Sequence, residues 1–283
     1  MSVAAVACKS GWQARLALGY ALLDERCVLV KREHYGPLRV QKSLYPEGAE
    51  HCHTIVLHPP GGIVGGDSLA IDAELGPQTK VLMTTPGAGK WYKSAGMQAS
   101  QKLTFKIAPG ALLEWLPQEN IVFDGARANL STEVDLAQDA LFFGWEITCL
   151  GRAAMGECFT RGQLRQTTQI RKAGKPIWGE YSTLDGGDPL LESPIGLAGR
   201  SVTGSLILAG KTPPAELLAS CRQIEVDQQQ GERAGITALP EIFSARFIGN
   251  HSQQAKRYFV QLWQILRPWF ADRPACSPRI WQT

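Results

Sequence analysis

The sequence lacks long apolar runs, and it lacks dense blocks of positive charge. Its 283 residues are 44% apolar and 19% charged, with a net charge of +3 and the Lys and Arg residues scattered along the chain. No run approaches the ~18 apolar residues of a membrane span, and the N-terminal segment has no signal-peptide core. These absences argue against membrane insertion and against nucleic-acid binding, and they predict a cytoplasmic globular protein.

Conventional catalytic and metal motifs are also missing. The seven cysteines form no CxxC pair, which argues against a zinc finger and against a disulfide framework. Gly89-Lys90 resembles part of a phosphate-binding loop, but Thr84 stands where that loop requires glycine and Trp91 where it requires Ser or Thr. We expect residues 80–93 to form a tight hairpin instead.

Glycine, by contrast, is abundant, and it is concentrated in the segment His58 to Asp67, which reads HPPGGIVGGD. Proline fixes φ and glycine reaches positive φ without strain, so we expect two sharp turns that deliver Asp67 to the start of the next strand. The predicted turn formers are Pro59, Pro60, Gly61, Gly62, Gly65 and Gly66.

Residues 12–210 read as consecutive short strands. Leu103, Phe105 and Ile107, for example, alternate with polar residues, a period of two that predicts a sheet with one buried face. Turn signals divide the runs at the spacing of a mainly β fold, namely a sandwich, a barrel or a β-helix-like solenoid. Because no fixed repeat period is present, spacing alone does not choose among the three.

The closing segment, residues 211–283, contains two predicted helices. One spans Ala215 to Arg222, and the other runs from about His251 to Phe270 with Asn250 as N-cap. The second helix carries apolar residues on one face. That face either seals the sheets or docks a partner, in which case Trp263 or Trp269 would provide the contact. No linker separates these helices from the strands, so we predict one domain over residues 1–283.

The histidines suggest a weak metal site. His51 and His53 lie on one face of a predicted strand, and imidazole pairs suit borderline metals. His58 lies an odd number of residues further on, so in a continuing strand its side chain would point to the opposite face. The alternative is that all three histidines are structural.

Three carboxylates lie among apolar or glycine neighbours. Asp67 either binds backbone N–H groups in its turn or lines a cavity. Glu146 lies within an apolar strand, where it would need a partner or a raised pKa, and Arg152 is the nearest candidate partner in the sequence. Glu180 shares a strand face with Trp178, so it is either solvent-facing or a buried polar site residue.

Six motifs, in order, together resemble one family. They are GPLRVQKSLYPEG from Gly36, HPPGGIVGGD from His58, LMTTPGAGKWYKS from Leu82, LEWLPQENIVFDGA from Leu113, GWEITCLGRAAMGE from Gly144 and PRIWQT from Pro278. Over nearly the whole chain they are similar to the urease accessory proteins called UreD or UreH. One departure is Gly89, where the family usually has threonine.

The resemblance implies a non-catalytic chaperone of urease maturation. Proteins of this family bind apo-urease and recruit UreF, which engages the GTPase UreG, and nickel passes to urease without a permanently bound cofactor. The implied fold is β-helix-like with two helices. Water-filled tunnels are proposed to conduct nickel, and the resemblance implies Asp67 and Glu180 as tunnel residues, with Glu146 a weaker third. The alternatives are an all-β scaffold without a nickel role and an enzyme that uses Glu146 with Arg152.

Overall fold

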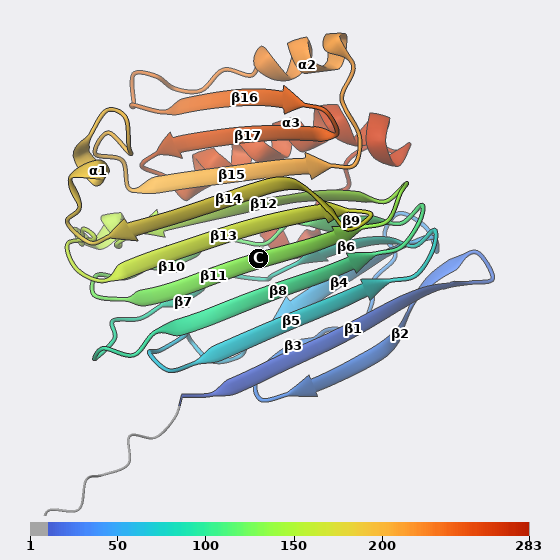
Figure 1. Cartoon of the computed structure of the whole chain (residues 1–283), viewed down its shortest axis with the longest axis horizontal. Helices are drawn as coiled ribbons and strands as arrows, with labels where there is room; N and C mark the ends of the chain where they lie inside the picture. The colour runs from blue at the N-terminus through green and yellow to red at the C-terminus, as the bar shows by residue number, and fades with distance from the viewer. Residues whose placement is uncertain (1–10, 283) are drawn as a thin grey trace, which may run out of the picture.

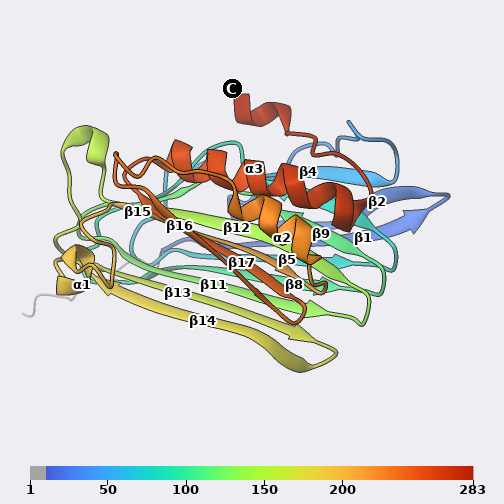
Figure 2. The ribbon, with the colours of Figure 1, turned by 90° about the horizontal axis from the view of Figure 1, so that it is seen from above.

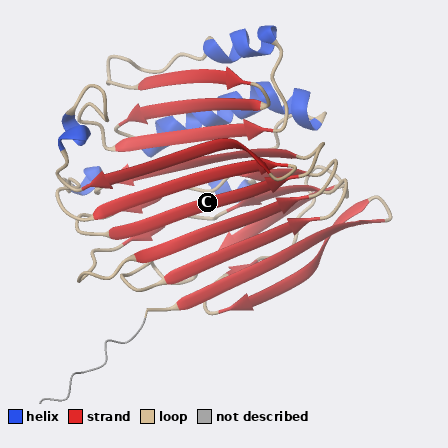
Figure 3. Cartoon of the chain, viewed as in Figure 1, coloured by secondary structure: helices blue, strands red, loops and turns tan. Residues whose placement is uncertain are grey.

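A computed structural model describes residues 11–282, which fold into two packed β-sheets covered on one side by helices. Figure 1 shows the strands running side by side, and Figure 3 shows how little of the chain is helical. Strands account for 48% of the structure, arranged as a solenoid of about 4 turns. The predicted mainly β, solenoid-like fold is therefore confirmed, and the sandwich and barrel alternatives are set aside.

The smaller sheet has seven strands, and its interior strands run parallel. In spatial order they are β14 (Lys175–Asp185), β13 (Gln163–Lys172), β11 (Arg127–Leu136), β8 (Ala99–Ile107), β5 (Ser68–Leu75), β1 (Gln13–Leu23) and β2 (Arg26–Tyr35). The predicted alternation holds, because Leu103, Phe105 and Ile107 of β8 are buried while Lys102 and Lys106 are exposed.

The larger sheet has ten strands. Its main path is β16 (Arg233–Leu239), β17 (Ile242–Gly249), β15 (Val202–Ala209), β12 (Leu141–Leu150), β9 (Leu112–Trp115), β6 (Lys80–Thr84), β4 (His51–Leu57) and β3 (Arg39–Val40), with β10 (Asn120–Val122) and β7 (Gly89–Trp91) paired beside it.

Consecutive strands alternate between the two sheets, which produces the solenoid. The chain passes from β4 in the larger sheet to β5 in the smaller, returns to β6, and repeats this crossing through β8, β9, β11, β12 and β13. Each full turn adds one parallel strand to each sheet. The space between the sheets is filled mainly by apolar side chains from every turn, because strand alternation directs one face of each sheet inward.

The loop His58–Asp67 makes the crossing from β4 to β5, and it bends twice as predicted, at residues 60–61 and at residues 65–66. Gly66 adopts φ +97°. Gly62 must be glycine for a different reason, since an added Cβ would lie 2.4 Å from the ring of Tyr92. The cluster of glycines thus serves positive φ at one site and close approach at another.

Helix α3 (Ser252–Ala271) covers the outer face of the larger sheet. Figure 2 shows α3 on one side of the molecule, with β13 and β14 on the other. Its buried face includes Phe259, Leu262, Trp263, Leu266 and Phe270, as the apolar spacing predicts. Among residues 11–282, no helix is both long enough and apolar enough to cross a membrane.

The other helices are short. Helix α2 (Ala215–Arg222) matches its prediction and packs beside α3. Helix α1 (Pro189–Glu192) begins at an Asp188 cap, and two 3-10 turns, η1 (Ala153–Met155) and η2 (Arg279–Gln282), complete the set over the described residues. Asn250 is not the N-cap of α3, because that position belongs to His251 and the Asn250 side chain accepts a hydrogen bond from the Ser201 backbone.

One further prediction needs correction. Residues 80–93 do not form a hairpin, because β6 pairs in parallel with β4 and β9 whereas β7 pairs with β10. In a solenoid a strand pairs with strands of the preceding and following turns, so adjacency in the chain does not imply pairing. The closing segment contains its two predicted helices and, in addition, contributes β16 and β17 to the larger sheet.

Candidate functional site

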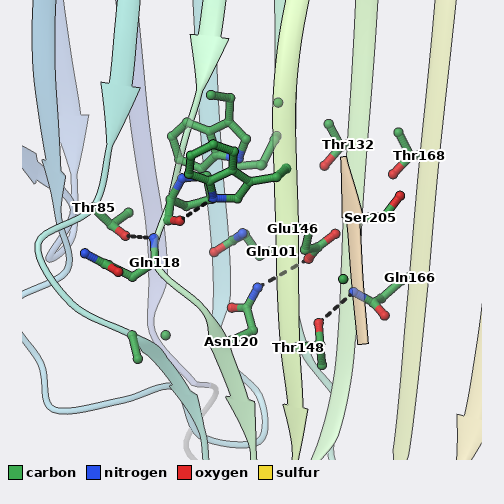
Figure 4. A pocket seen from close by; sticks show the side chains of 18 of the residues that line it. Thr85, Gln101, Gln118, Asn120, Thr132, Glu146, Thr148, Gln166, Thr168 and Ser205 are labelled. Atoms are coloured by element: carbon green, nitrogen blue, oxygen red, sulfur yellow. Dashed lines mark hydrogen bonds between the residues drawn. The ribbon is translucent and has the colours of Figure 1, made fainter. Parts of the chain in front are cut away.

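The main cavity of the described chain lies between the two sheets and has a volume of about 700 Å³. Most of the interior between the sheets is apolar, but this region carries hydroxyl, amide and carboxylate groups from both walls. Figure 4 shows Thr132, Thr168, Ser205 and Glu146 grouped in the same space. A polar interior of this size must be hydrated or occupied, because polar groups buried without partners are costly.

Strand register explains how the polar side chains come together. In the larger sheet Glu146 pairs with Ser205, and Ser205 pairs with Arg246. Directly paired residues on neighbouring strands point to the same face, so these three side chains form one row across β12, β15 and β17.

The smaller sheet faces this row with a second one. Thr132 pairs with Thr168, and Thr168 pairs with Glu180, which gives a row across β11, β13 and β14. All six residues of the two rows line the cavity. The two rows therefore place a carboxylate on each wall of the same interior space.

Glu146 projects from the middle of the larger sheet. Its carboxylate accepts a hydrogen bond of 3.3 Å from the Asn120 side chain. Burial raises the pKa of Glu146 to about 7, with Gln166 opposing the rise and the charge of Glu180 adding to it. The carboxyl group thus changes charge near neutral pH.

Glu180 lies at the edge of the smaller sheet and is partly exposed. Its carboxylate forms an ion pair of 2.6 Å with Arg246 from the opposite sheet. The Ser205 hydroxyl donates a weak hydrogen bond of 3.5 Å to the other Glu180 oxygen. Of the two alternatives for Glu180, the structure therefore supports a polar residue of the cavity wall.

His58 also lines the cavity, at the start of the glycine-rich loop. Burial lowers the pKa of His58, and the charge of Asp67 opposes this only in part. The imidazole is therefore neutral at pH 7, the form that binds metal ions. His58 is the histidine that the cavity contains, and the structure separates it from His51 and His53.

Asp67 does not line this cavity. One carboxylate oxygen accepts the backbone N–H of Trp12 at 2.8 Å, and the other accepts that of Val64 at 2.9 Å. Asp67 is 5% exposed and closes its own turn while tying β1 to the loop. The turn interpretation of Asp67 is the one that the geometry supports.

The predicted pair of Glu146 with Arg152 is wrong. Arg152 forms its ion pair with Glu157, at 2.5 Å, and its guanidinium lies over the ring of Phe123. The reason is Gly151, whose φ of +77° turns the chain out of β12 before Arg152 is reached. No pair of Glu146 with Arg152 is present to support acid–base catalysis.

His51 and His53 lie on the opposite face of the larger sheet, in a buried polar cluster with Glu47, Glu114 and Arg267. His53 Nε2 lies 2.6 Å from a Glu47 oxygen. His51 Nε2 lies 3.1 Å from a Glu114 oxygen, although without the alignment of a hydrogen bond.

Arg267 of α3 connects the members of this cluster. Its guanidinium bonds to both oxygens of Glu114, each at 2.9 Å, and to both oxygens of Glu47. The Trp263 indole also donates to Glu114, at 2.6 Å. These bonds make Trp263 a core residue at 0% exposure, and Trp269 is only half-buried, with Lys211 over its ring.

Ligand atoms of Glu47, His51 and His53 lie within 4.8 Å of one another, so this set could hold a metal ion. A divalent cation would, however, lie next to the guanidinium that already binds both carboxylates. Like charges in a buried site repel strongly, so the cluster is better described as an anchor for α3.

Sequence reasoning missed the partners that complete both sites. Arg246 is the one charged residue in Phe243–Phe247, an otherwise mostly apolar strand segment, and a charge in such a segment can mark a specific contact. Glu114 in LEWLP shows the same signal. The threonine and serine rows carry no local signal, because they arise only from the register of strands on different turns.

Comparison with known proteins gives a consistent result. The model of a family described as UreD urease accessory protein matches residues 13–282. The chain is 51% identical over 272 residues to a urease accessory protein UreD of Methylobacillus flagellatus, covering 96% of this chain and 95% of that protein. It is 52% identical over 275 residues to the UreD of Dechloromonas aromatica, covering 96% and 95%, and 50% identical over 277 residues to the UreD of an Azoarcus species, covering 98% and 96%.

Proposed function

The chain belongs to the UreD family of urease accessory proteins, and from this we propose that it is a non-catalytic chaperone of urease maturation in the cytoplasm. It binds apo-urease, recruits UreF and through it the GTPase UreG, and conducts nickel toward the urease active site. Nickel is its cargo and is bound transiently.

The polar cavity supports the nickel part of this proposal. Transfer requires ligands that attract a dication but release it again, which favours a few spaced oxygen and imidazole groups over a closed thiolate site. Glu146, Glu180 and His58 supply such groups inside one cavity. The observation that carries the proposal is the presence of one carboxylate on each wall, because together they lower the energy of a dication between the sheets.

The other predicted residues divide into two groups. Asp67 keeps the turn that positions the loop beside His58, and both of its oxygens are engaged there. His51 and His53 anchor α3, so we place them outside the nickel route. Trp269 remains our candidate for a partner contact because part of its indole is accessible, whereas Trp263 is enclosed.

The test is nickel loading of urease co-produced with variants of this chain. We expect Glu146→Gln and Glu180→Gln each to lower the nickel content and activity of urease, while both variants still co-purify with the urease subunits and UreF. Glu133→Gln is the matched control, since Glu133 is an outward residue of β11 paired with Lys102 at 2.8 Å.

Two outcomes would contradict the proposal. Equal nickel content in urease matured with wild type and with both cavity variants would remove the conduit role and leave a scaffold. Fully active, nickel-loaded urease in the complete absence of this chain would remove the role in maturation itself.

A further inference from the structure

A cationic side chain of the cavity already occupies one of the carboxylates that a dication would bind. Among the described residues that line it, Glu146 and Glu180 are the carboxylates, and Lys90 and Arg246 are the permanent cations. Arg246 lies 2.6 Å from Glu180. A metal ion that uses this carboxylate must therefore displace, or share it with, the guanidinium.

The position of Arg246 suits a residue that moves. Its side chain is 52% exposed, whereas that of Glu180 is 22% exposed, so the guanidinium can leave the carboxylate for solvent. The pair also stands at a boundary, because Glu180 belongs to β14, the edge strand of the smaller sheet, and Arg246 reaches it from β17 of the larger sheet. It bridges the two sheets beside the open edge of the cavity.

Ser205 connects the pair of Glu180 and Arg246 with the second carboxylate, Glu146. The Ser205 hydroxyl contacts Glu180, and Ser205 lies between Arg246 and Glu146 in the strand register of the larger sheet. A cation that replaces Arg246 on Glu180 would thus be one strand away from Glu146. Two carboxylates on opposite walls provide the oxygen ligands that a single exposed carboxylate lacks.

We propose that Arg246 is a displaceable latch that occupies the cation position on Glu180 at the cavity edge, and that an entering divalent cation takes its place. This inference rests on the proposed nickel role of the cavity and adds a residue that sets its affinity. With the latch closed, Glu180 is neutralised by its own protein and does not hold metal tightly. With the latch open, Glu180 faces the cavity as a free carboxylate.

The experiment measures Ni²⁺ binding to the purified full chain by equilibrium dialysis. Arg246→Gln removes the competing charge, so its dissociation constant for Ni²⁺ should fall about five-fold, since an ion pair of this partial exposure contributes up to ~1 kcal/mol. Arg246→Lys keeps the charge and should stay within about two-fold of wild type. Arg15→Gln is the matched control, because Arg15 forms an exposed pair with Asp72 on the outer face of the smaller sheet, away from the cavity.

The double variant Arg246→Gln/Glu180→Gln separates the latch from the conduit. Its Ni²⁺ affinity should drop below that of Arg246→Gln, because the released carboxylate is gone. Equal affinity in wild type and Arg246→Gln, together with a loss in Glu180→Gln, would overturn the latch and leave the nickel role intact. Ni²⁺ binding that is insensitive to Glu180 in every variant would overturn both. Circular dichroism and thermal unfolding of each variant would confirm that it is folded.

Discussion

Arg267 and Glu114 are 153 residues apart in sequence and form a two-bond contact, with Arg267 donating from Nε and from Nη2 to the two Glu114 oxygens at 2.9 Å each. Both side chains are 0% exposed. The contact fastens α3 to β9 beneath the apolar face of the helix. It therefore ties the closing segment to the solenoid through charge as well as through apolar packing.

Removing the guanidinium should be severely destabilising. Arg267→Ala leaves Glu47 and Glu114 buried without their cation, so we expect the free energy of unfolding to fall by about 3–5 kcal/mol. Urea titration followed by tryptophan fluorescence measures this. Arg15→Ala, which removes an exposed pair, should change stability by less than ~1 kcal/mol. A loss of that small size for Arg267→Ala would show that the anchor is not structural.

Glu47 should make stability fall in acid. Burial acts to raise its pKa, but His53 and Arg267 outweigh burial and lower it from 4.5 to about 2. A depressed carboxyl pKa contributes stability that is present above pH 4.5 and is lost as the pH falls toward 2. Glu47→Gln should therefore be less stable than wild type by about 3 kcal/mol at pH 7, with the gap narrowing below pH 4.5. Stability curves that run parallel from pH 7 to pH 3 would exclude this role.

The contribution of Glu146 to stability should depend on pH in the opposite direction. Burial raises its pKa from 4.5 to about 7, so the folded state binds the extra proton and wild-type stability declines as the pH rises through that window. Glu146→Gln carries no charge, so its stability relative to wild type should increase between pH 4.5 and pH 7, by up to about 3 kcal/mol. The two proteins share all their other titratable groups, so the difference between their free energies of unfolding reports the titration of Glu146. A constant difference would mean that folding does not raise the pKa of Glu146.

Asp67→Ala should affect folding and spare nickel transfer. The substitution leaves the backbone N–H groups of Trp12 and Val64 without their acceptor, which should cost about 1–3 kcal/mol. Nickel content per folded complex should match wild type, because Asp67 does not line the cavity. A folded Asp67→Ala protein that fails to load nickel would return Asp67 to the nickel path.

Gly62→Ala should disturb the loop through contact alone. Its added Cβ would lie 2.4 Å from the Tyr92 ring and 2.8 Å from the Lys90 carbonyl oxygen. Overpacking of this kind costs about 1–3 kcal/mol. Gly87→Ala is the control, since nothing lies within 4 Å of its Cβ position. Equal melting temperatures for the two variants would contradict the close-approach interpretation.

Local patterns predicted local structure well. The alternation through Leu103, Phe105 and Ile107 predicts β8 because strand periodicity belongs to the segment itself. The apolar face from Phe259 to Phe270 predicts α3 for the same reason. The prolines and glycines of HPPGGIVGGD predict its turns through backbone conformation, which needs no knowledge of distant contacts.

The partners of the charged residues were not predictable in this way. Sequence proximity favoured Arg152 for Glu146, but the turn at Gly151 directs Arg152 to Glu157. His51 and His53 suggested a metal site because the local sequence does not reveal their actual partners. Those partners, Glu47, Glu114 and Arg267, come from three separate segments of the chain. The polar rows of the cavity depend on which strands are neighbours, a property of the whole solenoid.

The anchor also has a consequence for the order of folding. Arg267 follows Glu47 by 220 residues, so both carboxylates of the cluster leave the ribosome long before their counter-ion is made. At roughly 5–20 residues per second, the solenoid waits some ten seconds or more for α3. During that interval burial of Glu47 and Glu114 is unfavourable, so this part of the larger sheet can close fully only after α3 has been synthesised. Docking of α3 thus couples the synthesis of this helix to completion of the fold.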